Sequence, residues 1–244
     1  AFGIIFGSLT LTELSMRTLK NGGAVGYYEE FISPKIASGF GWFQTFVYFP
    51  TLTVILSWVA GIYTCLLFGF EMTLETQVLI GLAYMLLFYL LNILSVKLGG
   101  YFQNATAVIK LIPLLGIALV SLFWSEPAPV LEAGIELVKT RDVGIAWLAA
   151  LVPIAFSFDG WIVSTSIASE VKNPKKNMTL ALIIGQIIVL GVYLMFFLGL
   201  NKMLGAEYIL STRDAAINKV GEMLLGAYGT RILLTFVLVS VLGV

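Results

Sequence analysis

Phe156-Ser157-Phe158-Asp159-Gly160-Trp161 interrupts an apolar stretch that runs from about residue 144 to residue 168. The stretch is long enough to cross a bilayer, yet it carries a carboxylate and a glycine near its middle. Lipid contains no water that could hydrogen-bond a carboxylate or an open backbone, so this part must face protein or a wet cavity. The sequence therefore predicts a membrane helix that is broken at mid-depth, with a binding site at the break.

The composition is that of a membrane protein. Hydrophobic residues make up 59% of the 244 residues and charged residues 11%, whereas soluble domains carry about 25% charged residues. The 14 basic and 14 acidic residues balance, which gives no bulk attraction to nucleic acid. The chain has no histidine, and its single cysteine, Cys65, lies in an apolar stretch. We therefore expect no metal site, no cofactor, no disulfide and no enzymatic activity.

Seven apolar segments predict an all-α integral membrane protein, since a spanning helix needs roughly 20 apolar residues. The second segment is longer than a bilayer requires, so we expect it to tilt or curve, helped by Pro50 and Gly61. Ala1 and Val244 lie inside apolar segments, so we expect the chain to be an internal part of a longer protein. The segments are residues 1–16, 39–68, 76–96, 103–124, 144–168, 178–203 and 228–244.

The connections between these segments predict the orientation of the chain. The connections after the odd-numbered segments are 17–38, 97–102 and 169–177, and they are short. They carry seven basic residues against six on the other side, where the count includes Lys202 and Arg231 near the ends of their segments. Short basic loops face the cytoplasm in multi-pass proteins, so we expect these three loops to be cytoplasmic in the plasma membrane.

One outer connection contains its own helix signal. Ser211-Thr212-Arg213-Asp214 matches a helix-capping pattern, and apolar residues then recur at helical spacing from Ala216 to Leu224. This pattern predicts a short amphipathic helix on the outer face. It is either an interfacial helix or part of an outer gate.

Two ionisable residues lie well inside predicted spans, Lys110 and Asp159. Lys110 is seven residues into its segment, so its ammonium either snorkels to the cytoplasmic interface or serves as a fixed internal cation. Asp159 is too short and too central to snorkel. Its carboxylate either satisfies the broken backbone or contacts a substrate or a proton, and Gly160 permits an unusual backbone or a close ligand approach.

The break is electrostatically suited to a zwitterion. The half-helix before it ends with unpaired carbonyl groups that attract an ammonium group, and the half-helix after it begins with free N–H groups. Phe156 and Phe158 are candidates to cover such a ligand, and the Ser157 hydroxyl is a candidate hydrogen-bond partner. For the two phenylalanines, ordinary packing is the alternative. Secondary transporters build many of their substrate sites from such broken helices.

The sequence resembles the amino acid–polyamine–organocation superfamily of transporters, and its L-type amino acid transporter branch most closely. That branch includes bacterial serine/threonine and alanine/serine/cysteine exchangers. The similar pieces cover nearly the whole chain in the expected order. They are T-E-L at 12–14, N-G-G at 21–23, G-W at 41–42, K-L-G-G-Y-F-Q-N at 97–104, K-L-I-P at 110–113, F-S-F-D-G-W at 156–161 and E-V-K-N-P-K-K-N at 170–177.

The resemblance implies a single transporter domain over residues 1–244, part of a LeuT-like inverted-repeat core. The seven segments correspond to the family's second to eighth helices, without the glycine-rich first helix. In this pattern Phe156 is an aromatic gate over the substrate, and carbonyl groups around Phe156, Phe158 and Asp159 hold its amino group. Ser157 and Gly160 line the pocket, and Lys110 replaces the sodium ion of sodium-dependent members.

These features together predict sodium-independent transport of neutral amino acids, by exchange and alternating access. A cationic amino acid or polyamine that pairs with Asp159 is an alternative substrate. A sensor that binds an amino acid without moving it is an alternative function. An integral-membrane enzyme lacks a visible catalytic cluster, and a channel would conduct faster than a carrier. The identity of any partner subunit does not follow from the sequence.

Overall fold

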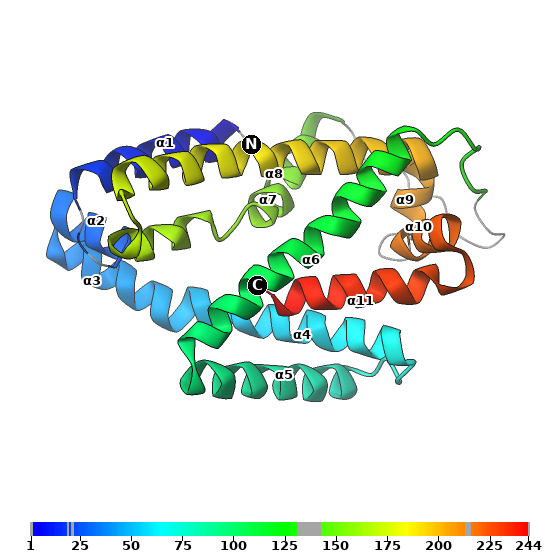
Figure 1. Cartoon of the computed structure of the whole chain (residues 1–244), viewed down its shortest axis with the longest axis horizontal. Helices are drawn as coiled ribbons and strands as arrows, with labels where there is room; N and C mark the ends of the chain where they lie inside the picture. Colours follow the sequence, from blue (N-terminus) through cyan, green and yellow to red (C-terminus); the bar gives the residue numbers. More distant parts are fainter. Residues whose placement is uncertain (1, 19, 21, 131–142, 213–215, 244) are drawn as a thin grey trace. The chain divides into compact units, whose positions relative to one another are not determined.

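A computed structural model describes residues 2–18, 20, 22–130, 143–212 and 216–243 of the chain. These residues form helices joined by short turns and include no β-strand (Figure 1). Within them, six helical stretches are long and apolar enough to cross a membrane. The prediction of an all-α membrane protein is therefore confirmed. The first predicted segment corresponds to helix α1, Phe2–Arg17, which has 16 residues and is shorter than these six stretches.

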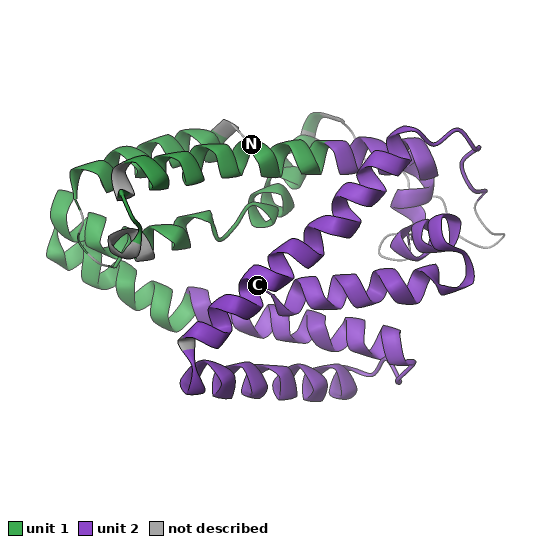
Figure 2. Cartoon of the chain, viewed as in Figure 1, with its two compact units in different colours: residues 1–47, 139–194 green, residues 48–138, 195–244 purple. Residues whose placement is uncertain are grey.

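The chain divides into two compact units, coloured separately in Figure 2. Unit 1 consists of residues 1–47 and 139–194, and unit 2 consists of residues 48–138 and 195–244. The prediction of one transporter domain over the whole chain remains a prediction.

Unit 1 is assembled from two separate parts of the sequence. Its small apolar core joins Met178 and Leu182 to Leu11, Trp161 and Val171. These residues tie the middle of α1 to the segment that follows the break. Its helices are α1, α2 (Ala24–Phe31), α3 (Pro34–Phe43), α7 (Val143–Ser157), the 3-10 helix η2 (Trp161–Glu170) and the first part of α8 (Pro174–Leu204).

Unit 2 contains the larger core. The core gathers Ile117, Met203, Leu204, Ala216, Val220 and Leu233, which come from four helices. Helix α11 contacts α4, α6 and α10, so it lies at the centre of the unit. The helices are α4 (Phe49–Phe68), α5 (Leu74–Leu94), α6 (Val96–Leu122), the end of α8, α9 (Ala206–Thr212), α10 (Ala216–Leu225), the short 3-10 helix η4 (Gly226–Tyr228) and α11 (Gly229–Leu242).

Helices α4 and α5 cross with their backbones in contact. A Cβ atom at Gly61 would lie 2.1 Å from the carbonyl oxygen of Gln77, and one at Gly81 would lie 2.6 Å from that of Ser57. No side chain fits at either glycine. Close to the crossing, Trp58 Nε1 donates a hydrogen bond to Gln77 Oε1 at 2.9 Å. Small residues that let backbones approach are typical of helix pairs in membranes.

The long second segment is helical from Pro34 to Phe68, over 35 residues. Residues Gln44–Tyr48 form a wider π-helical turn that ends two residues before Pro50. Proline lacks an N–H and its ring crowds the carbonyl four residues earlier, which a wider turn accommodates. Pro50 therefore follows a local irregularity of the helix, whereas Gly61 serves the contact with α5, and the bending of this segment stays a prediction.

Several predicted loops are shorter than expected. The connection predicted at 97–102 is helical instead, and Ser95 alone separates α5 from α6. Ser95 is extended, and its Oγ accepts a hydrogen bond from the N–H of Leu98 at 3.2 Å, which caps α6. The connection 17–38 likewise contains α2 and the start of α3. The cytoplasmic side of these connections remains a prediction.

Helix α8 begins at Pro174, four residues before the start of the predicted segment 178–203. Asn173 has a positive φ of 49°, and Pro174 is the first residue of the helix. Proline suits this position because the first N–H of a helix has no partner within it.

The predicted amphipathic helix is α10, which packs into the core of unit 2. Ala216 and Val220 are buried in that core beside Leu233 of α11. Ser211 and Thr212 are the last residues of α9, so they do not cap α10. Residues 213 and 214 of the predicted cap lie outside the described residues.

Candidate functional site

The predicted break lies between α7 and η2. Helix α7 ends at Ser157, and η2 begins at Trp161 (Figure 1). Gly160 has φ +93°, a conformation that residues with a side chain rarely adopt. A glycine is therefore needed at this position to let the chain leave the α-helix. Pro153 inside α7 removes one more helical hydrogen bond.

The last four carbonyl groups of α7 each accept one hydrogen bond. The Ser157 hydroxyl donates to Ile154 O at 2.8 Å, and two backbone N–H groups donate to Ala155 O at 3.2 Å and Phe156 O at 3.0 Å. The fourth carbonyl, Ser157 O, accepts from the Tyr193 hydroxyl at 2.8 Å. The end of α7 is thus held without help from solvent.

Polar backbone groups remain open within the break itself. Among the described residues, no group donates a hydrogen bond to the carbonyl of Phe158. The N–H groups of Trp161 and Ile162, at the start of η2, likewise meet no described acceptor. A partially negative and a partially positive group therefore lie within a few residues, as a zwitterionic ligand requires.

The side chains of the break differ in burial. Phe158 is 7% exposed, whereas Phe156 is 52% exposed. Ser157, Asp159 and Gly160 are also exposed. Phe158 is thus the packed residue of the break and Phe156 the accessible one. Asp159, which the sequence placed inside the span, is not enclosed by unit 1.

Tyr193 of α8 holds the break in place, and sequence reasoning did not single it out. Besides its hydrogen bond to Ser157 O, its ring meets the Phe158 ring edge-on, with centroids 5.3 Å apart and an interplanar angle of 87°. Its polar hydroxyl in the middle of an apolar span was the available signal. Its partners lie 35 and 36 residues away, and no local pattern identifies them.

The N-G-G motif positions α2 against η2. A Cβ atom at Gly23 would lie 2.8 Å from both Thr165 Oγ1 and Ser166 Oγ, so only glycine allows this approach. Tyr27 of α2 is buried, and burial raises the pKa of its hydroxyl above the ordinary 10.0. The neighbouring Thr165 lowers the pKa of Tyr27 and so offsets part of this increase. By distance and angle, however, the Tyr27 hydroxyl makes no hydrogen bond to any described residue. The segment after the break therefore rests on α2.

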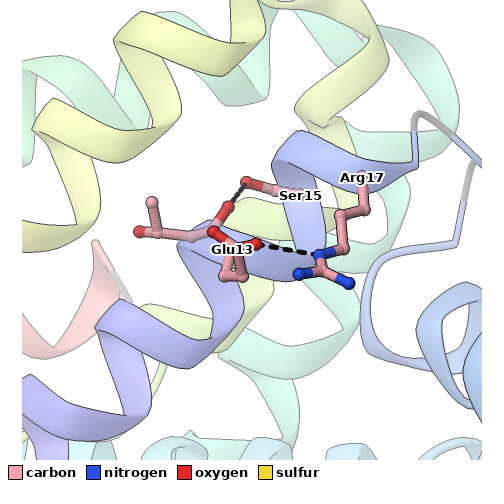
Figure 3. Close-up of polar contacts among 4 residues, drawn as sticks. Glu13, Ser15 and Arg17 are labelled. Carbon is pink, nitrogen blue, oxygen red and sulfur yellow. Dashed lines mark hydrogen bonds and ion pairs between the residues drawn. The ribbon is translucent and has the colours of Figure 1, made fainter.

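The T-E-L motif lies near the end of α1. Arg17 Nε donates a hydrogen bond to Glu13 Oε1 at 2.8 Å, and both side chains are more than half exposed (Figure 3). Such surface pairs contribute little to stability. The buried side of the same turn carries Thr12 and Ser15, and the Ser15 hydroxyl donates to Thr12 O at 2.8 Å. The motif thus separates a polar interior face from a charged surface.

Lys110 lines a cavity of about 150 Å³ in unit 2. The cavity lies between α6, α8, α10 and α11, and among its described lining residues Lys110 and Ser240 have polar side chains. Lys110 is half-buried, and no described residue pairs with its ammonium group. The choice between a fixed internal cation and a snorkelling side chain stays a prediction. Ser240 was not predicted.

The five predicted residues of the break form one local site in unit 1, whereas Lys110 belongs to unit 2. Among the described residues, no group of three or more Cys, Asp or Glu side chains is placed to hold a metal ion.

Comparison with known proteins identifies similar transporters. The model of the family described as "Amino acid permease" matches residues 1–244. The serine/threonine exchanger SteT of Bacillus subtilis is 30% identical over 237 residues, covering 97% of this chain and 52% of that protein. The human b(0,+)-type amino acid transporter 1 is 26% identical, covering 86% of this chain and 44% of that protein. The human large neutral amino acids transporter small subunit 2 is 24% identical, covering 92% and 43%. The chain spans about half the length of these relatives.

Proposed function

This chain belongs to the amino acid permease family, and from that premise we propose that it holds the ammonium end of an amino acid substrate. The whole protein exchanges neutral amino acids across the plasma membrane by alternating access, without sodium. The exchanger named among the relatives supports exchange, and the large neutral amino acids transporter supports neutral substrates.

The observation that carries this proposal is the set of open backbone groups at the break. The Phe158 carbonyl accepts no hydrogen bond from the described residues, while each of the last four carbonyls of α7 before it accepts one. An ammonium group donates up to three hydrogen bonds and seeks such acceptors. Tyr193 keeps the Ser157 carbonyl occupied, which directs the ligand to the next carbonyl along the chain.

Lys110 supports independence from sodium. An ammonium group that lines an interior cavity beside Ser240 supplies the positive charge that a bound sodium ion would otherwise provide. A second cation next to it would be repelled.

Asp159 distinguishes neutral from cationic substrates. Its side chain is exposed beside the break, so it is accessible to a cationic group of a ligand. We assign it no obligatory contact with a neutral amino acid. If transport favours arginine, lysine or a polyamine, the cationic alternative replaces the neutral one.

The test is flux through the full-length protein reconstituted in liposomes. We expect labelled serine, alanine or leucine to enter only when unlabelled amino acid is present inside, and at equal rates in sodium and in choline. Empty liposomes are the control. Absence of uptake with every amino acid and polyamine would refute transport, and binding without uptake would identify a sensor.

Phe156→Ala tests the aromatic gate. Phe156 is exposed and accessible to a ligand, whereas Phe158 is packed against Tyr193. We expect the alanine variant to raise the KM for substrate with normal expression. Trp147→Ala, an equally exposed aromatic of α7 outside the break, is the matched control. Equal KM values for Phe156→Ala and the unmodified protein would exclude Phe156 from the gate.

A further inference from the structure

Hydroxyl side chains in the helices of this chain usually bond to their own backbone. Thr10 donates to Phe6 O at 3.0 Å, Thr64 to Ala60 O at 2.7 Å, and Thr235 to Arg231 O at 2.8 Å. This bond one turn back satisfies the hydroxyl without any tertiary partner.

Ser8 and Thr12 of α1 are exceptions. They are 0% and 4% exposed, and in the described part of the chain neither hydroxyl has a hydrogen-bond partner. A buried hydroxyl without a partner is costly, and buried polar groups in proteins nearly always find one. Two such groups in one helix therefore indicate a bound molecule that satisfies both.

The spacing of the two residues fits a single water molecule. Residues four apart lie on one face of a helix, with Cβ atoms about 5–6 Å apart. A water that bonds two hydroxyls at about 2.8 Å each spans a similar distance. The next hydroxyl on this face, Ser15, already donates to Thr12 O and leaves the Ser8–Thr12 pair as the open positions.

The surroundings favour a neutral ligand. The fully buried polar side chains described in unit 1 all carry hydroxyl groups, and the buried side-chain oxygen of the partly buried Gln186 belongs to a neutral amide; the hydroxyl side chains are those of Ser8, Thr12, Ser15, Thr18, Thr165 and Tyr27. A cation taken out of water needs compensating negative charge, and this set contains no carboxylate. Water needs only donors and acceptors of the kind that hydroxyls supply.

We propose that Ser8 and Thr12 bind an internal water molecule on the buried face of α1. The site adjoins the contact between α1 and η2. A Cβ atom at Gly7 would lie 3.0 Å from the Trp161 ring, and Leu11 packs in the same cluster as Trp161. The water is an exchangeable hydrogen-bond partner next to the half-helix that starts after the break. The site itself does not depend on the transport proposal.

A double-mutant cycle in the full-length protein tests whether the two hydroxyls share a ligand. Ser8→Ala and Thr12→Val should each lower Tm by about 2–4 °C, because each leaves the other hydroxyl and the water short of a partner. The double variant should lower Tm by less than the two shifts added together. The matched control is Thr10→Val, an exposed threonine of the same helix, whose effect should add to that of Thr12→Val. Additive effects of Ser8→Ala and Thr12→Val would overturn the proposal.

Two measurements on the unmodified protein complete the test. A density map that resolves ordered waters should show one within hydrogen-bonding distance of both hydroxyls. Well-resolved hydroxyls that bond back to the carbonyls of Ile4 and Ser8, with no water, would overturn the proposal. Tm should be the same in sodium, potassium, lithium and choline, and a rise with one cation alone would show that a cation occupies the site instead.

Discussion

Replacement of Tyr193 by phenylalanine isolates one hydrogen bond at the break. The Tyr193 hydroxyl donates to Ser157 O at 2.8 Å, and its ring stacks edge-on against Phe158. Phenylalanine keeps the ring contact and removes only the donor. The Ser157 carbonyl then loses the only hydrogen bond that it accepts from the described residues.

The expected size of the effect follows from these two contacts. A neutral hydrogen bond contributes about 0.5–1.5 kcal/mol net, which corresponds to about a 2- to 12-fold change in an equilibrium constant. The ring contact contributes about another 0.5–1.5 kcal/mol, and a large-to-small change in a packed site adds a cavity cost. Tyr193→Phe should therefore raise KM about 2- to 12-fold, and Tyr193→Ala should raise it further.

The assay is substrate concentration dependence of uptake, with protein amount and Tm measured on the same preparations. If Tyr193 positions the break, Tyr193→Phe raises KM, and the loss of about 0.5–1.5 kcal/mol of stability also lowers Tm by about 1–6 °C. An unchanged KM in Tyr193→Phe would refute this reasoning. Equal losses in Tyr193→Phe and Tyr193→Ala would assign the whole effect to the hydroxyl and contradict the estimate for the ring.

Three further predictions concern other residues. Lys110→Met should reduce flux roughly tenfold or more, equivalent to about 1.4 kcal/mol, because methionine fills the cavity without the charge. Expression should stay normal, and normal flux would exclude the fixed cation. Gly61→Ala should cost about 1–3 kcal/mol of stability in thermal unfolding, because its Cβ would lie 2.1 Å from a backbone oxygen. Gly116→Ala is the control and should be tolerated, because a Cβ there meets no described atom within 4 Å. Equal Tm values for the two variants would contradict the close contact between α4 and α5. Tyr27→Phe should lessen the loss of stability above pH 10. Burial raises the pKa of Tyr27 above 10.0, so the contribution of Tyr27 to folding stability is complete below pH 10 and is lost as the pH rises further. Identical curves of stability against pH for the variant and the unmodified protein would contradict this.

The sequence predicted the features that local chemistry determines. Apolar stretches of sufficient length identified the membrane helices, since lipid requires such stretches. Gly160 pointed to the break, because its backbone conformation, with φ +93°, is one that residues with a side chain rarely adopt. Membership of the transporter family, predicted from the order of the motifs, is confirmed by the match over residues 1–244.

Features that depend on distant partners were not predicted. Gly61 looks like a flexible point in the sequence, yet its role is set by Gln77 on another helix. Tyr193 gains its importance from residues far away along the chain, and the exposure of Asp159 depends on how unit 1 packs. The stretch 97–102 was expected to be a loop because it lies between two apolar segments, but the Ser95 cap allows the helix to begin before it.

The single-residue connection at Ser95 has a mechanical consequence for unit 2. The Phe88 and Phe102 rings are in contact on either side of Ser95, with centroids 5.2 Å apart, so the end of α5 packs directly against the start of α6. Helix α5 is in turn locked to α4 through the backbone crossing at Gly61 and Gly81. A displacement at the base of α6 is therefore transmitted to both neighbours. Lys110 lies on α6, so the helix that carries its charge is connected through Ser95 to the closely packed α4–α5 pair.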